Sequence, residues 1–199
     1  MPFTSILQSN WQNFGAPIQF GNSIISQPAP DNPICMKGIT KTEKDCCRLP
    51  SLVDQSIDNR CALENPTMIS PSAKKTEGCC IAQCVLTTLN ALENDTVDRA
   101  ALKKSFLVAD GIDRNFSPLF NNTIDDCSNV INNNSVFKAT PVSSVLGRPG
   151  CSFIPEGFFD CVKSSLFQRC PVAVWDDISE CKQLKQKLSA GCSFASLTG

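Results

Sequence analysis

Residues 79–84 read CCIAQC and residues 161–171 read CVKSSLFQRCP, and these two stretches decide the fold class. Side chains four residues apart on a helix lie one above the other, so a helix through the first stretch projects Cys80 and Cys84 from one face. Cysteines placed in this way can each bridge to a different neighbouring helix. The pattern therefore predicts helices that are joined to one another by disulfides.

The cysteine content indicates an oxidising compartment. The chain holds 13 cysteines and no histidine in 199 residues. This many cysteines is typical of a disulfide framework in the secretory pathway. We expect six bridges, each stabilising the fold by roughly 2–4 kcal/mol, and one cysteine left over or shared with a second chain. Zinc is the alternative explanation, but the chain has no C-x2-C pair and no histidine ligand, so we expect no metal and no cofactor.

The charge pattern and the missing histidine exclude several classes of protein. The net charge is −1 without a basic block, and no apolar stretch has the length of a transmembrane helix, so we expect neither a nucleic acid nor a membrane as partner. A serine or cysteine hydrolase of the usual kind needs histidine as its base. Acidic pairs such as Asp125-Asp126 lie at expected helix starts, where they stabilise the helix dipole. We therefore predict that the protein is not an enzyme.

The N-terminal segment differs from the rest of the chain. Residues 1–34 contain no cysteine and lack the basic start and apolar run of a signal peptide. Because the cysteines indicate secretion, we interpret the sequence as a mature chain whose signal has been removed. The segment is rich in apolar side chains, and we expect an arm that lies across its own domain or crosses to a partner in a homodimer. Residues 35–199 are expected to form one helical domain. Four glycosylation sequons begin at Asn94, Asn115, Asn121 and Asn133.

Apolar periodicity and turn signals predict a series of short helices. They are expected over about 49–58, 76–93, 97–109 and 123–132, then from Pro155, and last from Asp176 or Asp177 to Gly191. Thr96 is the expected N-cap of the helix at 97–109. The chain has no alternating runs and no Asn-Gly hairpin signal, so strands are not expected. The prediction is an all-α fold with disulfides between helices.

The ordered cysteine series resembles that of the insect odorant-binding proteins, specifically the Plus-C subgroup. Members of this subgroup add cysteines around a six-cysteine core and place a proline directly after the sixth. The series here runs through Cys80, Cys84, Cys127, Cys151, Cys161, Cys170-Pro171 and Cys181. Cys46-Cys47 followed by Leu49-Pro50 also looks like this subgroup. The resemblance covers about residues 46–181.

The resemblance implies a set of disulfide partners. It makes Cys80, Cys84, Cys127, Cys161 and Cys170 the second to sixth core cysteines, and Cys47 the preferred first, with Cys46 and Cys61 as alternatives. The family pairs first with third, second with fifth and fourth with sixth. This implies the bridges Cys47–Cys84, Cys80–Cys161 and Cys127–Cys170, with Cys151–Cys181 as an extra one. Sequence alone does not pair Cys35, Cys46, Cys61, Cys79 and Cys192.

The resemblance also implies a function. It predicts one disulfide-rich domain of six to eight short helices around a hydrophobic cavity, in an extracellular carrier of odorants or pheromones in sensory lymph, with an olfactory receptor as a further partner. Such a cavity binds an apolar molecule by removing its surface from water, which contributes roughly 25 cal/mol per Å². The alternative is a secreted disulfide-rich module that binds proteins, such as an inhibitor or defence protein, whose core would be filled.

Candidate lining residues are the large apolar side chains of the expected helices, each equally well explained as ordinary core. They are Leu89, Leu102, Phe106, Phe120, Val130, Phe158, Phe159, Leu166, Phe167 and Trp175. Trp175 can also offer its indole N–H to a ligand oxygen. Many odorant carriers are thought to release ligand in mild acid, where histidine ordinarily titrates. In this chain such release would need carboxylates with raised pKa.

Overall fold

The computed structural model describes residues 18–20, 23–25, 35, 41–65, 77–108, 114–134, 150–190, 192 and 194. Within them lie seven α-helices, two short β-hairpins and one short 3-10 helix, so the predicted all-α, disulfide-rich fold is confirmed. The chain divides into two compact units, Met1–Arg48 with Val174–Gly199, and Leu49–Ala173. The domain boundary expected between residues 34 and 35 stays a prediction, because most of the expected arm lies outside the described residues.

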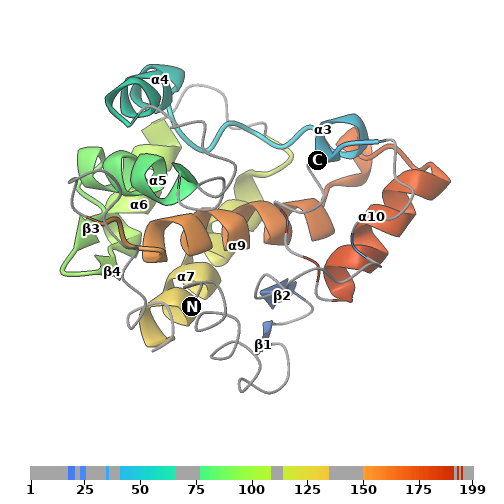
Figure 1. The fold of residues 1–199 in the computed structure, drawn as a ribbon. Coiled ribbons are helices and arrows are strands. Elements are labelled where there is room, and N and C mark those ends of the chain that lie inside the picture. Colours follow the sequence, from blue (N-terminus) through green and yellow to red (C-terminus); the bar gives the residue numbers. More distant parts are fainter. Residues whose placement is uncertain are drawn as a thin grey trace, which may run out of the picture. The chain divides into compact units, whose positions relative to one another are not determined.

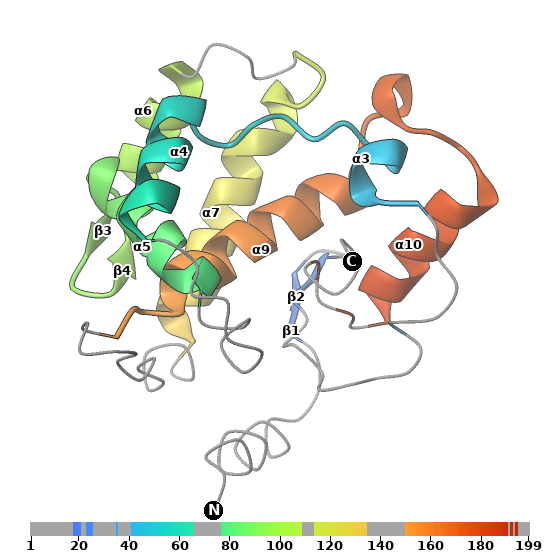
Figure 2. The same ribbon diagram turned by 45° about the horizontal axis from the view of Figure 1, so that its top comes forward.

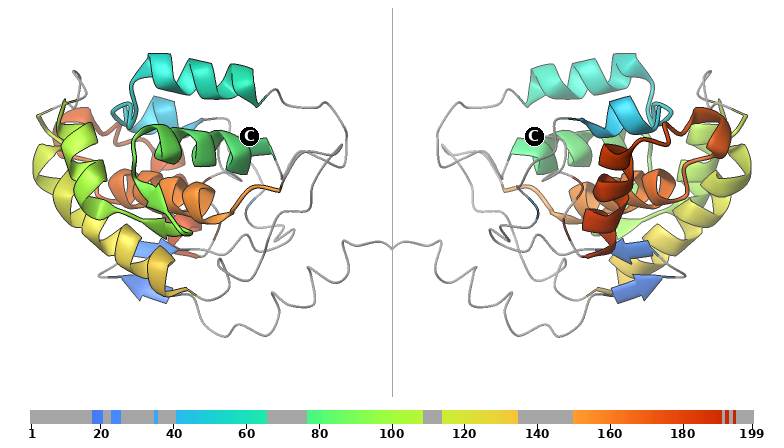
Figure 3. Two further views of the ribbon diagram at one scale, coloured as in Figure 1. Left: turned by 90° about the vertical axis from the view of Figure 1, so that its left-hand side faces the viewer. Right: turned by 90° about the vertical axis from the view of Figure 1, so that its right-hand side faces the viewer.

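The unit Leu49–Ala173 is built around one central helix. Its elements are α4 (Gln55–Glu64), α5 (Glu77–Thr88), β3 (Leu92–Glu93), β4 (Thr96–Val97), α6 (Arg99–Val108), α7 (Ser117–Asn133) and α9 (Ile154–Gln168). Helix α9 packs against both α5 and α7, and α6 packs against α7 (Figures 1 and 2). Helix α4 lies along α5, as Figure 3 shows. The core of this unit therefore forms where α5 and α7 meet α9.

The two longest helices follow from apolar spacing and a proline near the start. In α7 the buried side chains Phe120, Ile124, Cys127 and Ile131 recur every three or four residues, which places them on one face. Helix α9 has its own buried face. Each helix also has a proline in its first turn, where the missing N–H breaks no helical hydrogen bond. Helix α7 begins at Ser117, earlier than the predicted start at about 123.

Helix α4 begins later than the sequence analysis predicted. The expected helix over 49–58 is wrong in position, because α4 starts at Gln55 and reaches Glu64. The side chain of Asp54 accepts a hydrogen bond from the backbone N–H of Ser56 at 2.7 Å and so caps the helix. This N-terminal cap therefore sets the start of the helix.

A small hairpin between α5 and α6 was not expected from the sequence. Strand β3 pairs antiparallel with β4, in the register Leu92 with Val97 and Glu93 with Thr96. The turn residues Asn94 and Asp95 both have positive φ, 48° and 55°, which these residue types tolerate better than most. The expectation that strands would be absent is therefore wrong here, because an Asn-Asp pair makes the turn that Asn-Gly usually makes.

The ends of α5 and α6 are also set locally. Asn90, at φ 53°, ends α5 in the left-handed conformation, and Ala91 N–H donates to the carbonyl of Leu86 at 2.8 Å. The helix therefore stops at Thr88, before the predicted residue 93. Asp98 Oδ1 accepts from Ala100 N at 2.8 Å and caps α6, so Thr96 is not the N-cap.

The unit formed by Met1–Arg48 and Val174–Gly199 contains α3 (Glu43–Cys46), α10 (Ser179–Ser189), and a hairpin of β1 (Ile18–Phe20) with β2 (Ser23–Ile25). Helix α10 packs against α3 and β2. Cys47 forms an isolated antiparallel bridge with Trp175, and Asp176 N–H donates to the carbonyl of Cys46 at 2.9 Å. Two segments far apart in the sequence thus run side by side in this unit.

Candidate ligand-binding site

Twelve of the 13 cysteines are disulfide-bonded, and Cys79 carries a buried thiol. The expected count of six bridges and one further cysteine is confirmed. The twelve include all eight cysteines of the predicted framework. The unit Leu49–Ala173 holds Cys61–Cys84, Cys80–Cys151 and Cys127–Cys161, and the other unit holds Cys35–Cys192 and Cys46–Cys181.

The disulfide partners implied by the family resemblance are wrong. The implied Cys47–Cys84, Cys80–Cys161, Cys127–Cys170 and Cys151–Cys181 are all replaced by other pairs. Cys84 bridges to a neighbouring helix, α4, as expected, whereas Cys80 bridges to the non-helical segment before α9. Cys61, left open as an alternative first core cysteine, pairs with the third, Cys84. Partner choice depends on which elements pack together, which cysteine order does not specify.

Nine of the ten candidate lining residues lie in the unit Leu49–Ala173, on α6, α7 and α9 or just after α5. Seven of them are buried: Leu102, Phe106, Phe120, Val130, Phe158, Leu166 and Phe167. Leu89 and Phe159 are partly exposed. The rings of Phe106 and Phe120 meet edge to face with their centroids 5.5 Å apart. The packing of α6 on α7 and of α7 on α9 therefore brings the members of this group together.

Trp175 lies in the other unit, and its indole N–H is engaged within the chain. It donates to Asp177 Oδ1 at 3.3 Å, while Lys185 Nζ lies 3.8 Å from the centroid of the ring. Asp177 also pairs with Lys182 at 3.1 Å. Hydrogen bonds from Lys182 and Trp175 lower the pKa of Asp177. The role of this N–H as a donor to ligand stays a prediction, and in this structure the N–H is bonded to Asp177.

A buried serine on α7 is a further polar group of this unit, and no sequence motif indicated it. Ser128 on α7 is 2% exposed, and its hydroxyl has no hydrogen-bond partner among the residues that the structure describes. Asp125 and Asn132 lie on the same side of α7, at helical spacing. Lys103 of α6 binds Asp125 at 2.6 Å, and Asn132 bonds the backbone of Val97 in β4. The Ser128 hydroxyl therefore belongs to the side of α7 that faces α6 and β4, where Leu102 and Phe106 also lie.

Two acidic side chains of α9 have raised pKa values. Burial raises the pKa of Glu156 to about 7, and the neighbouring Asp160 adds to this while Lys163 opposes it. Burial likewise raises the pKa of Asp160. In a chain without histidine, a response to mild acid would need carboxylates with raised pKa, and these two residues are of that kind. Their positions four residues apart place them on one side of α9.

The helices of this unit, its disulfides and its buried apolar group define the class of protein. A family model described as AgamOBP47-like matches residues 50–187, and the chain belongs to this family of insect odorant-binding proteins. Its likeness to the Plus-C subgroup is confirmed. The chain is similar to General odorant-binding protein 67 of Anopheles gambiae, with 28% identity over 179 residues that cover 87% of this chain and 85% of that protein. It is also similar to Odorant-binding protein 47 of the same species, with 27% identity over 175 residues, covering 80% and 74%.

Among the described residues, no helix has both the length and the apolar composition needed to cross a bilayer.

Proposed function

We propose that this protein is an extracellular carrier that binds small hydrophobic molecules without chemical change to them. The observation that carries the proposal is the family match over residues 50–187, a range that includes every candidate lining residue. The two relatives described above are named as odorant-binding proteins. Odorants or pheromones of sensory lymph are the ligand class that this family suggests.

The buried apolar group between α6, α7 and α9 is the proposed binding site. Leu102, Phe106, Phe120 and Phe158 offer aliphatic and aromatic surface, with Leu89 and Phe159 at its partly exposed edge. An apolar ligand seated among them would leave water at roughly 25 cal/mol per Å² of buried surface. The disulfide Cys127–Cys161 joins α7 to α9, and would keep these two helices from moving apart or collapsing when ligand enters and leaves.

The Ser128 hydroxyl is the proposed polar contact in this site. A buried hydroxyl without a partner is unfavourable by about 1–3 kcal/mol, and a ligand oxygen would supply the missing hydrogen bond. Carbonyl compounds and alcohols would therefore bind more tightly than hydrocarbons of equal length. The ligands we expect are therefore small apolar molecules that carry a carbonyl or hydroxyl oxygen.

The test is displacement of a fluorescent hydrophobic probe from the oxidised protein by a panel of small apolar volatiles. We expect saturable binding at micromolar concentration that is lost when the disulfides are reduced and alkylated. Probe binding that does not saturate, or that survives reduction and alkylation unchanged, would contradict the carrier proposal. It would support the alternative of a protein-binding module with a filled core.

A homodimer formed through residues 1–34 and delivery of ligand to an olfactory receptor complete the proposal. Sedimentation of the full chain and of a variant without residues 1–34 tests the first part. We expect a dimer for the full chain and a monomer for the shortened one. Equal mass per particle for the two would exclude a dimer held by this segment.

A further inference from the structure

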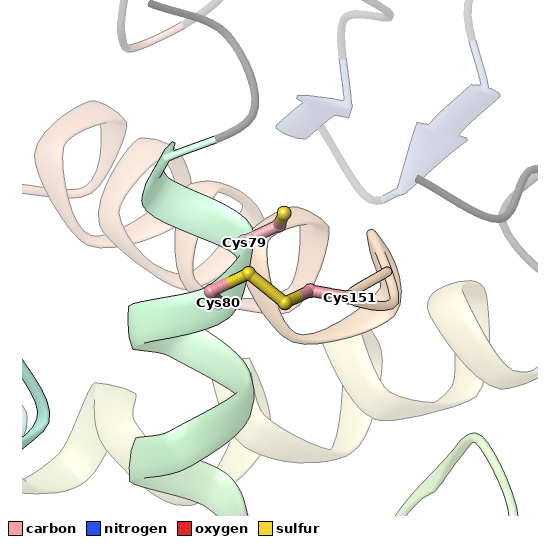
Figure 4. Close-up of side chains that lie close together, drawn as sticks. All are labelled: Cys79, Cys80 and Cys151. Atoms are coloured by element: carbon pink, nitrogen blue, oxygen red, sulfur yellow. A yellow bond between two sulfur atoms is a disulfide. The ribbon is translucent and has the colours of Figure 1, made fainter. Parts of the chain in front are cut away.

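Three sulfur atoms lie together where α5 meets the segment that leads into α9. The Sγ atoms of Cys79, Cys80 and Cys151 are all within 4.8 Å of one another. Cys80 and Cys151 form a disulfide, whereas Cys79 carries a thiol and is 0% exposed. Figure 4 shows Cys79 and Cys80 side by side on α5, with the sulfur of Cys79 next to the bridge. Two of the three sulfurs are bonded to each other, so the trio does not offer three thiolates to a metal ion.

We propose that Cys79 is a second partner for Cys151, and that the bridge passes between Cys80 and Cys79 by thiol–disulfide exchange. The thiolate of Cys79 attacks Sγ of Cys151, the Cys79–Cys151 bond forms and the Cys80–Cys151 bond breaks. Cys80 leaves as a thiolate and takes up the proton that Cys79 lost. One disulfide and one thiol are present before and after, so the step needs no oxidant or reductant.

Attack on the other sulfur of the bridge is disfavoured by backbone geometry. It would join Cys79 to Cys80, which are neighbours in the sequence with Cα atoms about 3.8 Å apart across a trans peptide. Disulfides usually span about 4.4–6.8 Å between Cα atoms, and the Cys80–Cys151 bridge spans 5.1 Å. A Cys79–Cys80 bond would therefore distort α5, whereas exchange onto Cys151 keeps a bridge between α5 and the start of α9.

The surroundings of Cys79 make the exchange slow at neutral pH. Burial raises the pKa of the Cys79 thiol to about 11, and the nearby Glu156 carboxylate adds to this effect. Asp160 and Lys163 lie beyond Glu156 on α9. From α4, Arg60 and Glu64 contact Thr88 and Cys84, further along α5. Because only the thiolate attacks, the exchange should speed up about tenfold per pH unit below this pKa.

The exchange has a structural consequence. Moving the bridge from Cys80 to Cys79 shifts its attachment by one residue, which is a rotation of about 100° around α5. The segment that enters α9 would then be held from a different side of α5. The two disulfide forms should therefore differ at the start of α9 while the other bridges stay in place.

The first test uses single substitutions and a count of thiols. In oxidatively folded Cys80→Ser we expect a Cys79–Cys151 bridge and no thiol, as judged by peptide mapping without reduction. The matched control is Cys79→Ser, which should keep Cys80–Cys151 and also contain no thiol. Two thiols at positions 79 and 151 in folded Cys80→Ser would overturn the proposal.

The second test uses the unsubstituted protein and so does not depend on the folding of a variant. The protein is held at pH 7 or pH 9 and then acidified to stop the exchange. It is next denatured in the presence of N-ethylmaleimide, which labels the one exposed thiol. After reduction and a second label, fragment masses locate the maleimide at Cys79 or Cys80. We expect label at both positions, reaching Cys80 faster at pH 9. Label that stays on Cys79 alone after prolonged incubation at pH 9 would overturn the proposal.

Discussion

The side chain of Asn132 pairs with the backbone of Val97 in the manner of a neighbouring strand. Its Oδ1 accepts from Val97 N at 2.8 Å, and its Nδ2 donates to Val97 O at 2.9 Å. Val97 is buried, so its backbone groups have little access to water. One amide of α7 therefore satisfies both polar groups at the edge of the β3–β4 hairpin and ties the hairpin to the helix.

Asn132→Ala should lower the free energy of unfolding by about 2 kcal/mol, because it leaves two buried backbone groups without partners. Urea unfolding followed by far-ultraviolet circular dichroism measures this. The control is Asn133→Ala, since Asn133 is exposed and its amide donates to the side chain of Asn129 on the same helix. Equal unfolding midpoints for the two variants would show that the hydrogen bonds between Asn132 and Val97 do not stabilise the fold.

Phe106→Leu should weaken binding of the hydrophobic probe about fivefold, because it removes part of the aromatic surface that contacts ligand in the proposed site. The matched control is Phe116→Leu, since Phe116 is equally buried but is not a candidate lining residue. Both variants should lose about 1 kcal/mol or more of stability. If they lose affinity equally, Phe106 acts only as core.

Ser128→Ala should weaken binding of a methyl ketone about fivefold and leave binding of the hydrocarbon of equal length unchanged. The variant should be as stable as the parent or more stable, because it removes a buried hydroxyl without a partner. Ser164→Ala, another buried serine, is the control. Competition with the fluorescent probe measures both affinities. A similar loss for ketone and hydrocarbon would argue against a hydrogen bond from Ser128.

Glu156→Gln should change how stability depends on pH. The pKa of Glu156 is raised from 4.5 to about 7 in the folded state, so the folded protein holds a proton that the unfolded chain has lost between these values. Stability should therefore fall as the pH rises from about 4.5 to 7, with Asp160 acting in the same sense. At pH 8 the variant should be about 2 kcal/mol more stable than the parent.

Urea unfolding at pH 5 and pH 8 measures this dependence. Glu93→Gln, which changes an exposed acid on β3, should unfold like the parent at both values. If Glu156→Gln shows the same difference between pH 5 and pH 8 as the parent, Glu156 is not the group responsible.

The sequence by itself determined the fold class, the family and the number of cysteines that form disulfides. Helical spacing placed Cys80 and Cys84 on one face, and the ordered series ending in Cys170-Pro171 indicated the family. These features are local, because the spacing of residues along a helix decides which side chains share a face. Helix boundaries were less accurate wherever a cap or turn set them, as at Asp54, Asn90 and Asn94-Asp95.

Only the tertiary structure decided which cysteines bond and which polar groups lie in the core. Cys84 pairs with Cys61 because α4 lies along α5, and Cys80 pairs with Cys151 because the start of α9 approaches α5. The raised pKa of Glu156 likewise depends on burial beside Asp160 rather than on sequence alone. Contacts between residues far apart in the sequence follow from how helices pack. Many packings satisfy the same cysteine order, so the sequence pattern does not select among them.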